Sequence, residues 1–154
     1  MANYTAADVK ALREKSGAGM MDCKGALDEA DGDIEKAFEV LRLKGLKGVS
    51  KREGRTTSNG LVVSRIASGS AVMIELACET DFVAKAENFV TLADQVADAI
   101  SASGATSIEA ALDAPLGDTT VSASIIDKAA IMGEKVELRK VEVISAPGLD
   151  AYMH

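Results

Sequence analysis

The sequence predicts an α+β fold in which helices come first and an antiparallel sheet follows. Residues 5–45 place apolar side chains at the three- and four-residue intervals that are typical of amphipathic helices. Residues 61–66 and 71–78 are rich in β-branched and other apolar side chains, and the segment between them contains Ser68-Gly69-Ser70. Two such runs around a turn predict a β-hairpin.

Three short helices account for the first 45 residues. The first is expected to begin after Thr5, a favourable N-cap, and to end at Gly17. The second should cover residues 20–30, and Asp33 can cap a third helix that ends near Gly45. Because this bundle has a thin core, we expect it to depend on a partner or on the rest of the chain.

The second half mixes helices and strands. Thr80 can cap a helical region, residues 108–112 and 120–132 read as two further helices, and residues 136–144 read as a strand. The apolar residues of this strand do not alternate strictly, so a β-bulge is expected. Residues 150–154 can begin another strand. One helix face is marked by Phe89, Leu92, Ala93, Val96 and Ile100.

The resulting domain organisation is a three-helix domain over residues 1–45, a linker over 46–60 and an α+β core over 61–154. A basic run at residues 42–55 leads into this linker and contains one acid, Glu53. Such a run is usually a solvated helix end or a linker, and the alternative is a docking patch for an acidic partner. The run consists of Arg42, Lys44, Lys47, Lys51, Arg52 and Arg55.

Charge and composition exclude several classes of protein. Residues 1–60 carry 11 Lys and Arg against 10 Asp and Glu, whereas residues 61–154 carry 6 against 14, for a net charge of −7. An acidic body argues against nucleic acid as a direct partner, because phosphate contacts need a basic surface. The apolar runs are shorter than the roughly 20 residues of a membrane span, and the N-terminus lacks a secretory pattern. We therefore expect a cytoplasmic protein without a membrane partner.

The sequence offers little for catalysis or metal binding. Cys23 and Cys78 lack CxxC spacing, and the single histidine is His154, so neither a zinc site nor any other metal site or cofactor is predicted. Each cysteine reads best as a small buried apolar residue. Gly17-Ala18-Gly19 reads as a tight turn rather than a phosphate site. No catalytic residues are predicted, although a small thiol- or carboxylate-dependent enzyme and a plain helical binding module remain alternatives.

Two short segments are candidates for partner binding. Thr80, Asp81, Phe82 and Val83 lie where a strand gives way to a helix. The apolar pattern alone favours Phe82 as a core residue, and the alternative is an apolar wedge on a rigid turn. In the Met20-Met21 pair, adjacent helical residues face different directions, so one of the two is expected outside as an adaptable contact.

These segments resemble elongation factor Ts. The resemblance rests on residues 12–27 (LREKSGAGMMDCKGAL), on residues 78–85 (CETDFVAK), and more weakly on Gly133-Glu134-Lys135 and Tyr152-Met153-His154. Gly25 departs from the family, which usually has a basic residue there. Family members usually continue well past such an end, so the chain is expected to be the N-terminal part of one, ending inside the core domain.

The resemblance implies a ubiquitin-associated-like three-helix domain, an α+β core, and a regulator rather than an enzyme. Its implied function is guanine-nucleotide exchange in protein synthesis, with elongation factor Tu as partner in both its GDP-bound and its nucleotide-free form. Residues 80–83 would disturb the magnesium and phosphate site of that partner. Asp81 and Phe82 would press into its GTPase domain near the magnesium ion. Met20, Met21 and His154 are weaker partner-binding candidates.

Overall fold

A computed structural model describes residues 3–153 and confirms the α+β class, with helices followed by an antiparallel sheet. The chain divides into two compact units, each of which is built from two segments. The first unit consists of residues 1–55 and 126–135, and the second of residues 56–125 and 136–154. The boundaries expected from the sequence, at residues 45 and 60, remain a prediction.

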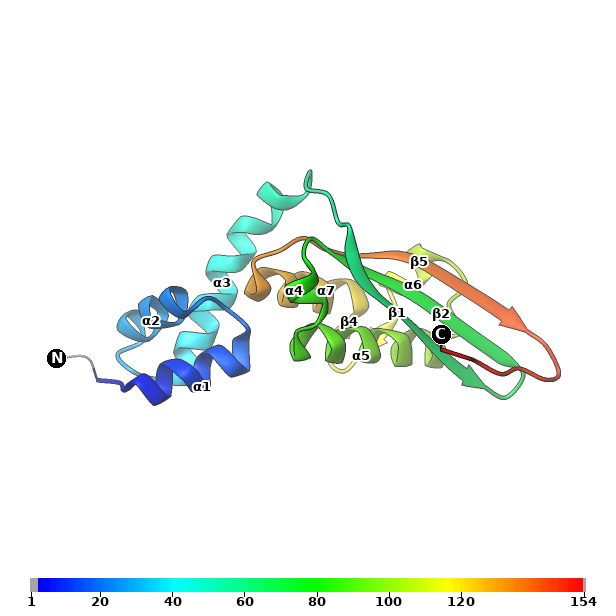
Figure 1. The fold of residues 1–154 in the computed structure, drawn as a ribbon, viewed down its shortest axis with the longest axis horizontal. Coiled ribbons are helices and arrows are strands. Elements are labelled where there is room, and N and C mark those ends of the chain that lie inside the picture. The colour runs from blue at the N-terminus through cyan, green and yellow to red at the C-terminus, as the bar shows by residue number, and fades with distance from the viewer. Residues whose placement is uncertain (1–2, 154) are drawn as a thin grey trace. The chain divides into compact units, whose positions relative to one another are not determined.

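The first unit begins with α1 (Ala6–Ser16), α2 (Met20–Glu29) and α3 (Ile34–Arg52) (Figure 1). The predicted capping residues act as expected, since Thr5 forms a capping box with Asp8, and Asp33 accepts a hydrogen bond from the Lys36 amide. Gly17 ends α1 in a left-handed conformation with φ of 74°. Local sequence signals therefore define this bundle.

The core of the first unit is small and apolar. Cys23 lies within it, fully buried, as expected of a cysteine that acts as an apolar side chain. Its neighbours come from all three helices, so the core holds the bundle together. The buried residues are Leu12, Ala18, Cys23, Ala26, Leu27, Ala30, Ala37 and Leu41.

The prediction that the third helix ends near Gly45 is wrong, because α3 continues to Arg52. The first part of the expected linker, residues 46–52, is therefore helical. Gly45 is required by packing rather than by a helix end. A Cβ at this position would overlap the carbonyl oxygen of Ala130, in the part of α7 (Val121–Met132) that belongs to this unit.

A three-stranded antiparallel sheet forms the centre of the second unit (Figure 1). β1 (Asn59–Ala67) and β2 (Ser70–Cys78) form the predicted hairpin, and β5 (Val136–Ser145) pairs with the other side of β2. β2 is therefore the central strand. Gly69 takes φ of 75° in the hairpin turn, a conformation that residues other than glycine rarely adopt.

The predicted bulge in the last strand is confirmed. Glu75 lies opposite Lys140 and Leu76 lies opposite Leu138, so Arg139 is the extra residue. Its guanidinium group donates hydrogen bonds to Glu75 and to the Thr57 carbonyl oxygen, just ahead of β1.

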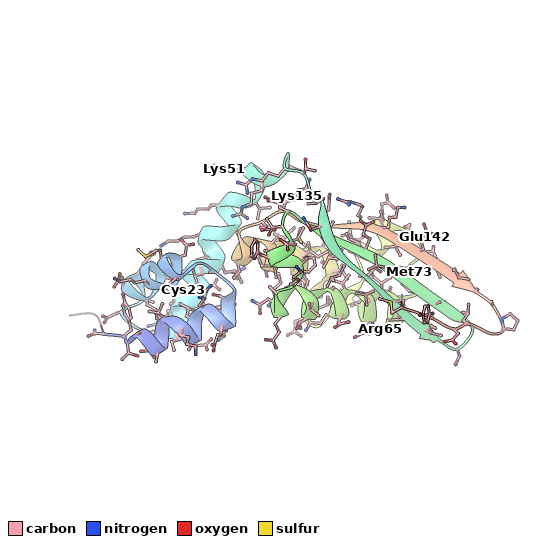
Figure 2. All side chains as sticks on the ribbon, in the orientation of Figure 1. Cys23, Lys51, Arg65, Met73, Lys135 and Glu142 are labelled. Carbon is pink, nitrogen blue, oxygen red and sulfur yellow. The ribbon has the colours of Figure 1, made fainter. Side chains whose placement is uncertain are left out.

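Helix α5 (Glu87–Ser103) covers one face of this sheet. Its predicted apolar face is buried, and the inward residues Val72, Ile74 and Leu76 of β2 are buried as well. Arg65 of β1, labelled in Figure 2, lies opposite the inward Val72 and so on the same face. It forms ion pairs with Asp94 and Asp98 of α5. The contact between α5 and the sheet therefore combines apolar packing with the ion pairs of Arg65 at its edge.

The remaining elements of the second unit are short. They are α4 (Asp81–Ala84), α6 (Ile108–Leu112), a small hairpin of β3 (Pro115–Leu116) and β4 (Thr119–Thr120), and residues 121–125 of α7. This hairpin was not predicted from the sequence. The strand expected at residues 150–154 is not observed, since residues 150–153 carry no regular secondary structure and His154 lies outside the described residues.

Two helix-interior glycines should respond oppositely to alanine. Gly45→Ala should destabilise the protein by about 1–3 kcal/mol, because the added methyl group overlaps the Ala130 carbonyl. Gly25→Ala is the matched control, because no atom lies within 4 Å of a Cβ there, and it should be neutral or stabilising by up to about 1 kcal/mol. Urea unfolding measures both changes. Equal destabilisation by the two variants would contradict the packing role of Gly45.

Candidate functional site

The first candidate segment is the turn that follows β2. Cys78, the last residue of β2, is buried, and α4 begins three positions later at Asp81. Thr80 caps this helix as predicted, because its hydroxyl oxygen accepts a hydrogen bond from the Val83 amide at 3.4 Å. The chain therefore passes from strand to helix within three residues, directly after the buried Cys78.

Phe82 is the most exposed part of this turn. Its side chain is 84% exposed, whereas Ala84, on the same short helix, is buried. The apolar pattern had favoured a core position for Phe82, and the structure places it outside. Burying a phenylalanine side chain is worth about 1.5–3 kcal/mol, and this free energy is not used within the folded unit.

Asp81 places a negative charge beside that ring. Its carboxylate forms an ion pair with Lys85 one turn later, at 2.9 Å. A side-chain hydrogen bond from Lys85, together with the charge of Lys85, lowers the pKa of Asp81 below its ordinary value. Asp81 is therefore ionised at neutral pH, and its charge is partly balanced within the helix.

Two hydrogen bonds from side chains to backbone carbonyl oxygens, which were not predicted from the sequence, also fix this turn. Asn59, at the start of β1, donates a side-chain hydrogen bond to the Glu79 carbonyl oxygen at 3.0 Å. The Cys78 thiol donates to the Thr80 carbonyl oxygen at 3.3 Å. The only available signal was indirect, because Asn59 could be placed opposite Cys78 only after the hairpin register was known.

Met20 and Met21, the second candidate pair, are both exposed, with 60% and 76% of their surface accessible. The expectation that one of them faces outward therefore understates their exposure. They line a shallow hollow of about 520 Å³ between α1 and α2. Tyr4, Val9 and the stems of nearby cations complete it, so the surface is apolar with a basic rim.

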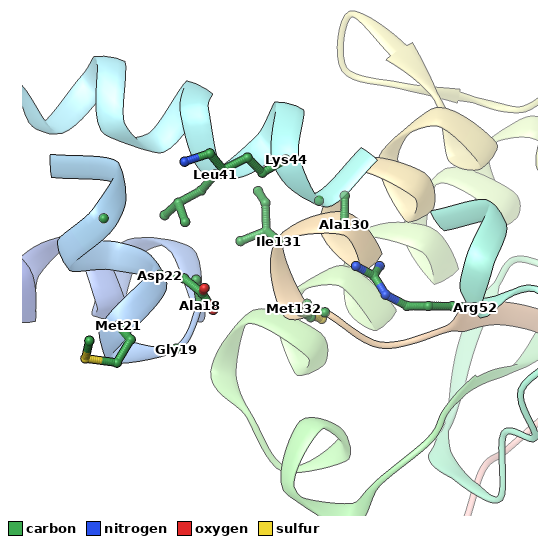
Figure 3. Close-up of a pocket in the computed structure, with 13 residues that line it drawn as sticks. Ala18, Gly19, Met21, Asp22, Leu41, Lys44, Arg52, Ala130, Ile131 and Met132 are labelled. Carbon is green, nitrogen blue, oxygen red and sulfur yellow. The ribbon is translucent and has the colours of Figure 1, made fainter. Parts of the chain in front are cut away.

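A second hollow, of about 310 Å³, lies in the first unit between α2, α3 and the end of α7 (Figure 3). Its lining includes Leu41, Ile131 and Arg52, and the Arg52 guanidinium donates to the Ala129 carbonyl oxygen at 3.4 Å. The turn at Gly19 lies on its wall, and Gly25 adds no side chain. Residues 17–19 connect two helices, in agreement with the tight turn favoured by the sequence.

Part of the basic run is engaged within the first unit. Arg42 forms ion pairs with Glu39 and Asp127, and Lys44 pairs with Glu29. These contacts favour a structural role for those two cations over a docking role.

The described residues give no positive support to metal or thiol chemistry. Residues 3–153 contain no group of three or more His, Cys, Asp or Glu side chains that could hold a metal ion. Burial raises the pKa of Cys23, which makes its thiol a poor nucleophile at neutral pH. Within the same residues, no helix is long and apolar enough to cross a membrane. His154, one of the weaker candidates, lies outside the part of the chain that is described.

Comparison with known proteins gives a consistent picture. A family model described as elongation factor TS matches residues 79–154. Over the whole chain, proteins named elongation factor Ts are 59% identical in Leifsonia xyli subsp. xyli, 54% in Arthrobacter sp. strain FB24 and 56% in Clavibacter michiganensis subsp. michiganensis. The chain spans 56%, 55% and 56% of those proteins, respectively, so it covers just over half of their length.

The Asp81–Lys85 pair predicts a measurable titration. The carboxylate of Asp81 should titrate below the ordinary aspartate value of about 3.9, and Lys85→Gln should raise its pKa toward that value. Because the folded-state pKa is depressed, any stabilisation by this pair is present at neutral pH and is lost as the pH falls through the folded-state pKa. NMR titration of the side-chain carboxyl carbon measures the midpoint. An unchanged midpoint in Lys85→Gln would show that the pair is absent in solution.

Proposed function

We propose, since this chain belongs to the elongation factor Ts family, that it acts in translation elongation as a guanine-nucleotide exchange factor for elongation factor Tu. The observation that carries the proposal is the exposure of Phe82 on a capped turn, inside the segment matched by the family model. Aromatic side chains such as Phe are enriched at the cores of protein–protein interfaces, and this ring is available for burial in a partner.

In the proposed mechanism, Phe82 and Asp81 press into the nucleotide-binding domain of elongation factor Tu, near its magnesium ion. Magnesium requires near-ideal octahedral geometry and bridges the nucleotide phosphates. A small displacement of its surroundings therefore weakens nucleotide binding. Thr80 and Val83 contribute by holding the helical turn that carries the two side chains.

The energy for exchange comes from binding alone. The factor binds the nucleotide-free partner more tightly than the GDP-bound partner. Thermodynamic reciprocity then requires that GDP and the factor lower each other's affinity for the partner by the same ratio. No bond of GDP or GTP is made or broken in this mechanism. The chain therefore acts as a regulator rather than an enzyme.

The first unit supplies a separate docking contact. Met20 and Met21 present flexible apolar side chains beside a basic rim, a surface that can adapt to a partner. This contact should add affinity without disturbing the magnesium site. His154, which belongs to the second unit, stays a weaker candidate for partner binding.

One mixing experiment separates this proposal from its rivals. Elongation factor Tu loaded with fluorescent GDP is mixed with the chain and excess unlabelled GDP. Faster release supports exchange, binding without faster release supports a plain binding module, and neither effect would leave a thiol- or carboxylate-dependent enzyme as the alternative.

Phe82→Ala should lower the acceleration of GDP release by roughly ten- to a hundredfold, because the lost burial of about 1.5–3 kcal/mol occurs only in the complex. Stopped-flow fluorescence measures the release. The melting temperature should hardly change, since the ring is exposed in the unbound chain. Phe89→Ala is the matched control, because Phe89 is fully buried and its loss should cost about 3–5 kcal/mol of stability. A folded Phe82→Ala variant with wild-type release would refute the wedge.

Met21→Ser should weaken the docking contact. We expect the concentration of factor that gives half-maximal release to rise roughly three- to tenfold, while the maximal release rate stays unchanged. A titration of the same release reaction measures both quantities. A fall in the maximal rate alone would place Met21 in the displacement step rather than in docking.

A further inference from the structure

We propose that Asn59 is a positioning residue for the turn that carries Phe82, a role that rests on the exchange function proposed above. Asn59 is the first residue of β1 and lies opposite Cys78, the last residue of β2. Its side chain reaches past the end of the strand pairing to the turn. It is therefore separated from Phe82 in sequence but joined to it through the backbone of Glu79.

The contact is made by the side-chain amide. Asn59 Nδ2 donates a hydrogen bond to the Glu79 carbonyl oxygen at 3.0 Å, and the Ser58 hydroxyl reaches the same oxygen at 3.5 Å. A carbonyl oxygen only accepts, so this interaction requires the NH₂ group of the amide. An aspartate at position 59 has the same shape but would place an oxygen against an oxygen.

A second side chain holds the next carbonyl. The Cys78 thiol donates to the Thr80 oxygen at 3.3 Å, and the same oxygen accepts the Ala84 amide at 3.2 Å. Two consecutive peptide groups ahead of Asp81 are thus held by side chains from two strands. These contacts support the extended conformation of Thr80, with φ of −121° and ψ of 155°, from which α4 begins.

Backbone anchoring matters here because Phe82 has little packing of its own. With 84% of its surface exposed, the ring is oriented by the direction of α4 rather than by neighbouring side chains. A loosened turn would still fold and still present the ring, but in a wider range of directions. Binding energy would then be lost in orienting the ring during displacement.

The test compares Asn59→Asp with Asn88→Asp, which makes the same chemical change in α5 away from this contact. Release of fluorescent GDP from elongation factor Tu is followed as a function of factor concentration. We expect Asn59→Asp to lower the maximal release rate roughly three- to tenfold, with a smaller change in the half-saturating concentration. Asn88→Asp should match the wild type in both.

This readout separates positioning from a loss of stability. Fewer folded molecules would raise the apparent half-saturating concentration and leave the maximal rate unchanged. Asn59→Ala gives a second test without an added charge and should lower the maximal rate in the same direction. Of the Cys78 variants, Cys78→Ser keeps a donor for the Thr80 oxygen and should retain more of the maximal rate than Cys78→Ala.

The outcomes distinguish a failure of the exchange function from a failure of the positioning role of Asn59. If the wild-type chain does not accelerate release, the exchange function fails, and the positioning role fails with it. If the wild type and Asn88→Asp accelerate release, and either Asn59 variant reaches the wild-type maximal rate, only the positioning role is overturned. A maximal rate that is reduced in both Asn59 variants supports the positioning role. Their melting curves should match the wild type, or any loss of folded protein should appear separately, as a shift in the half-saturating concentration.

Discussion

The pairing of β2 on both of its edges is the constraint on which the second unit depends. As the central strand, β2 sends Val72, Ile74 and Leu76 into the core, where α5 covers them. A shift by one residue would turn these side chains outward, so the register is strongly specified. The same register fixes where pairing stops, at Cys78, and so where the turn toward Phe82 begins.

The site therefore joins a rigid strand to an exposed apolar side chain. Thr80 ends the extended backbone and caps α4, whereas the buried Ala84 ties the short helix to the unit. The exposed ring of Phe82 contributes nothing to the core of the unit. Under the proposed function, its burial would contribute free energy only in the complex, as a mechanism of coupled binding requires.

Most of the fold could be predicted because its signals are local. Caps at Thr5 and Asp33, the glycine that ends α1, and the hairpin around Gly69 each depend on a few neighbouring residues. The bulge at Arg139 could be predicted from the broken alternation of its strand. The length of α3 could not, because Gly45 resembles a helix end, and the reason for it is a contact with Ala130, far along the chain.

The candidate site could be predicted only in part, because some of its features depend on contacts between residues that are distant in the sequence. The change from strand to helix and the cap at Thr80 can be predicted from the sequence. The exposure of Phe82 cannot, because it depends on which face of α4 packs against the core. An apolar residue beside a buried strand resembles a core residue until the packing is known. The role of Asn59 depends on the register of two strands, so it became visible only in the structure.

In the function proposed above, this chain and the nucleotide lower each other's affinity for elongation factor Tu. Isothermal titration calorimetry can measure the affinity of the chain for the nucleotide-free partner and for the GDP-saturated partner under identical conditions. Binding to the nucleotide-free form should be tighter by roughly tenfold or more. Equal affinity for the two forms would contradict the proposed function, because a ligand that binds both states equally cannot shift the balance between them.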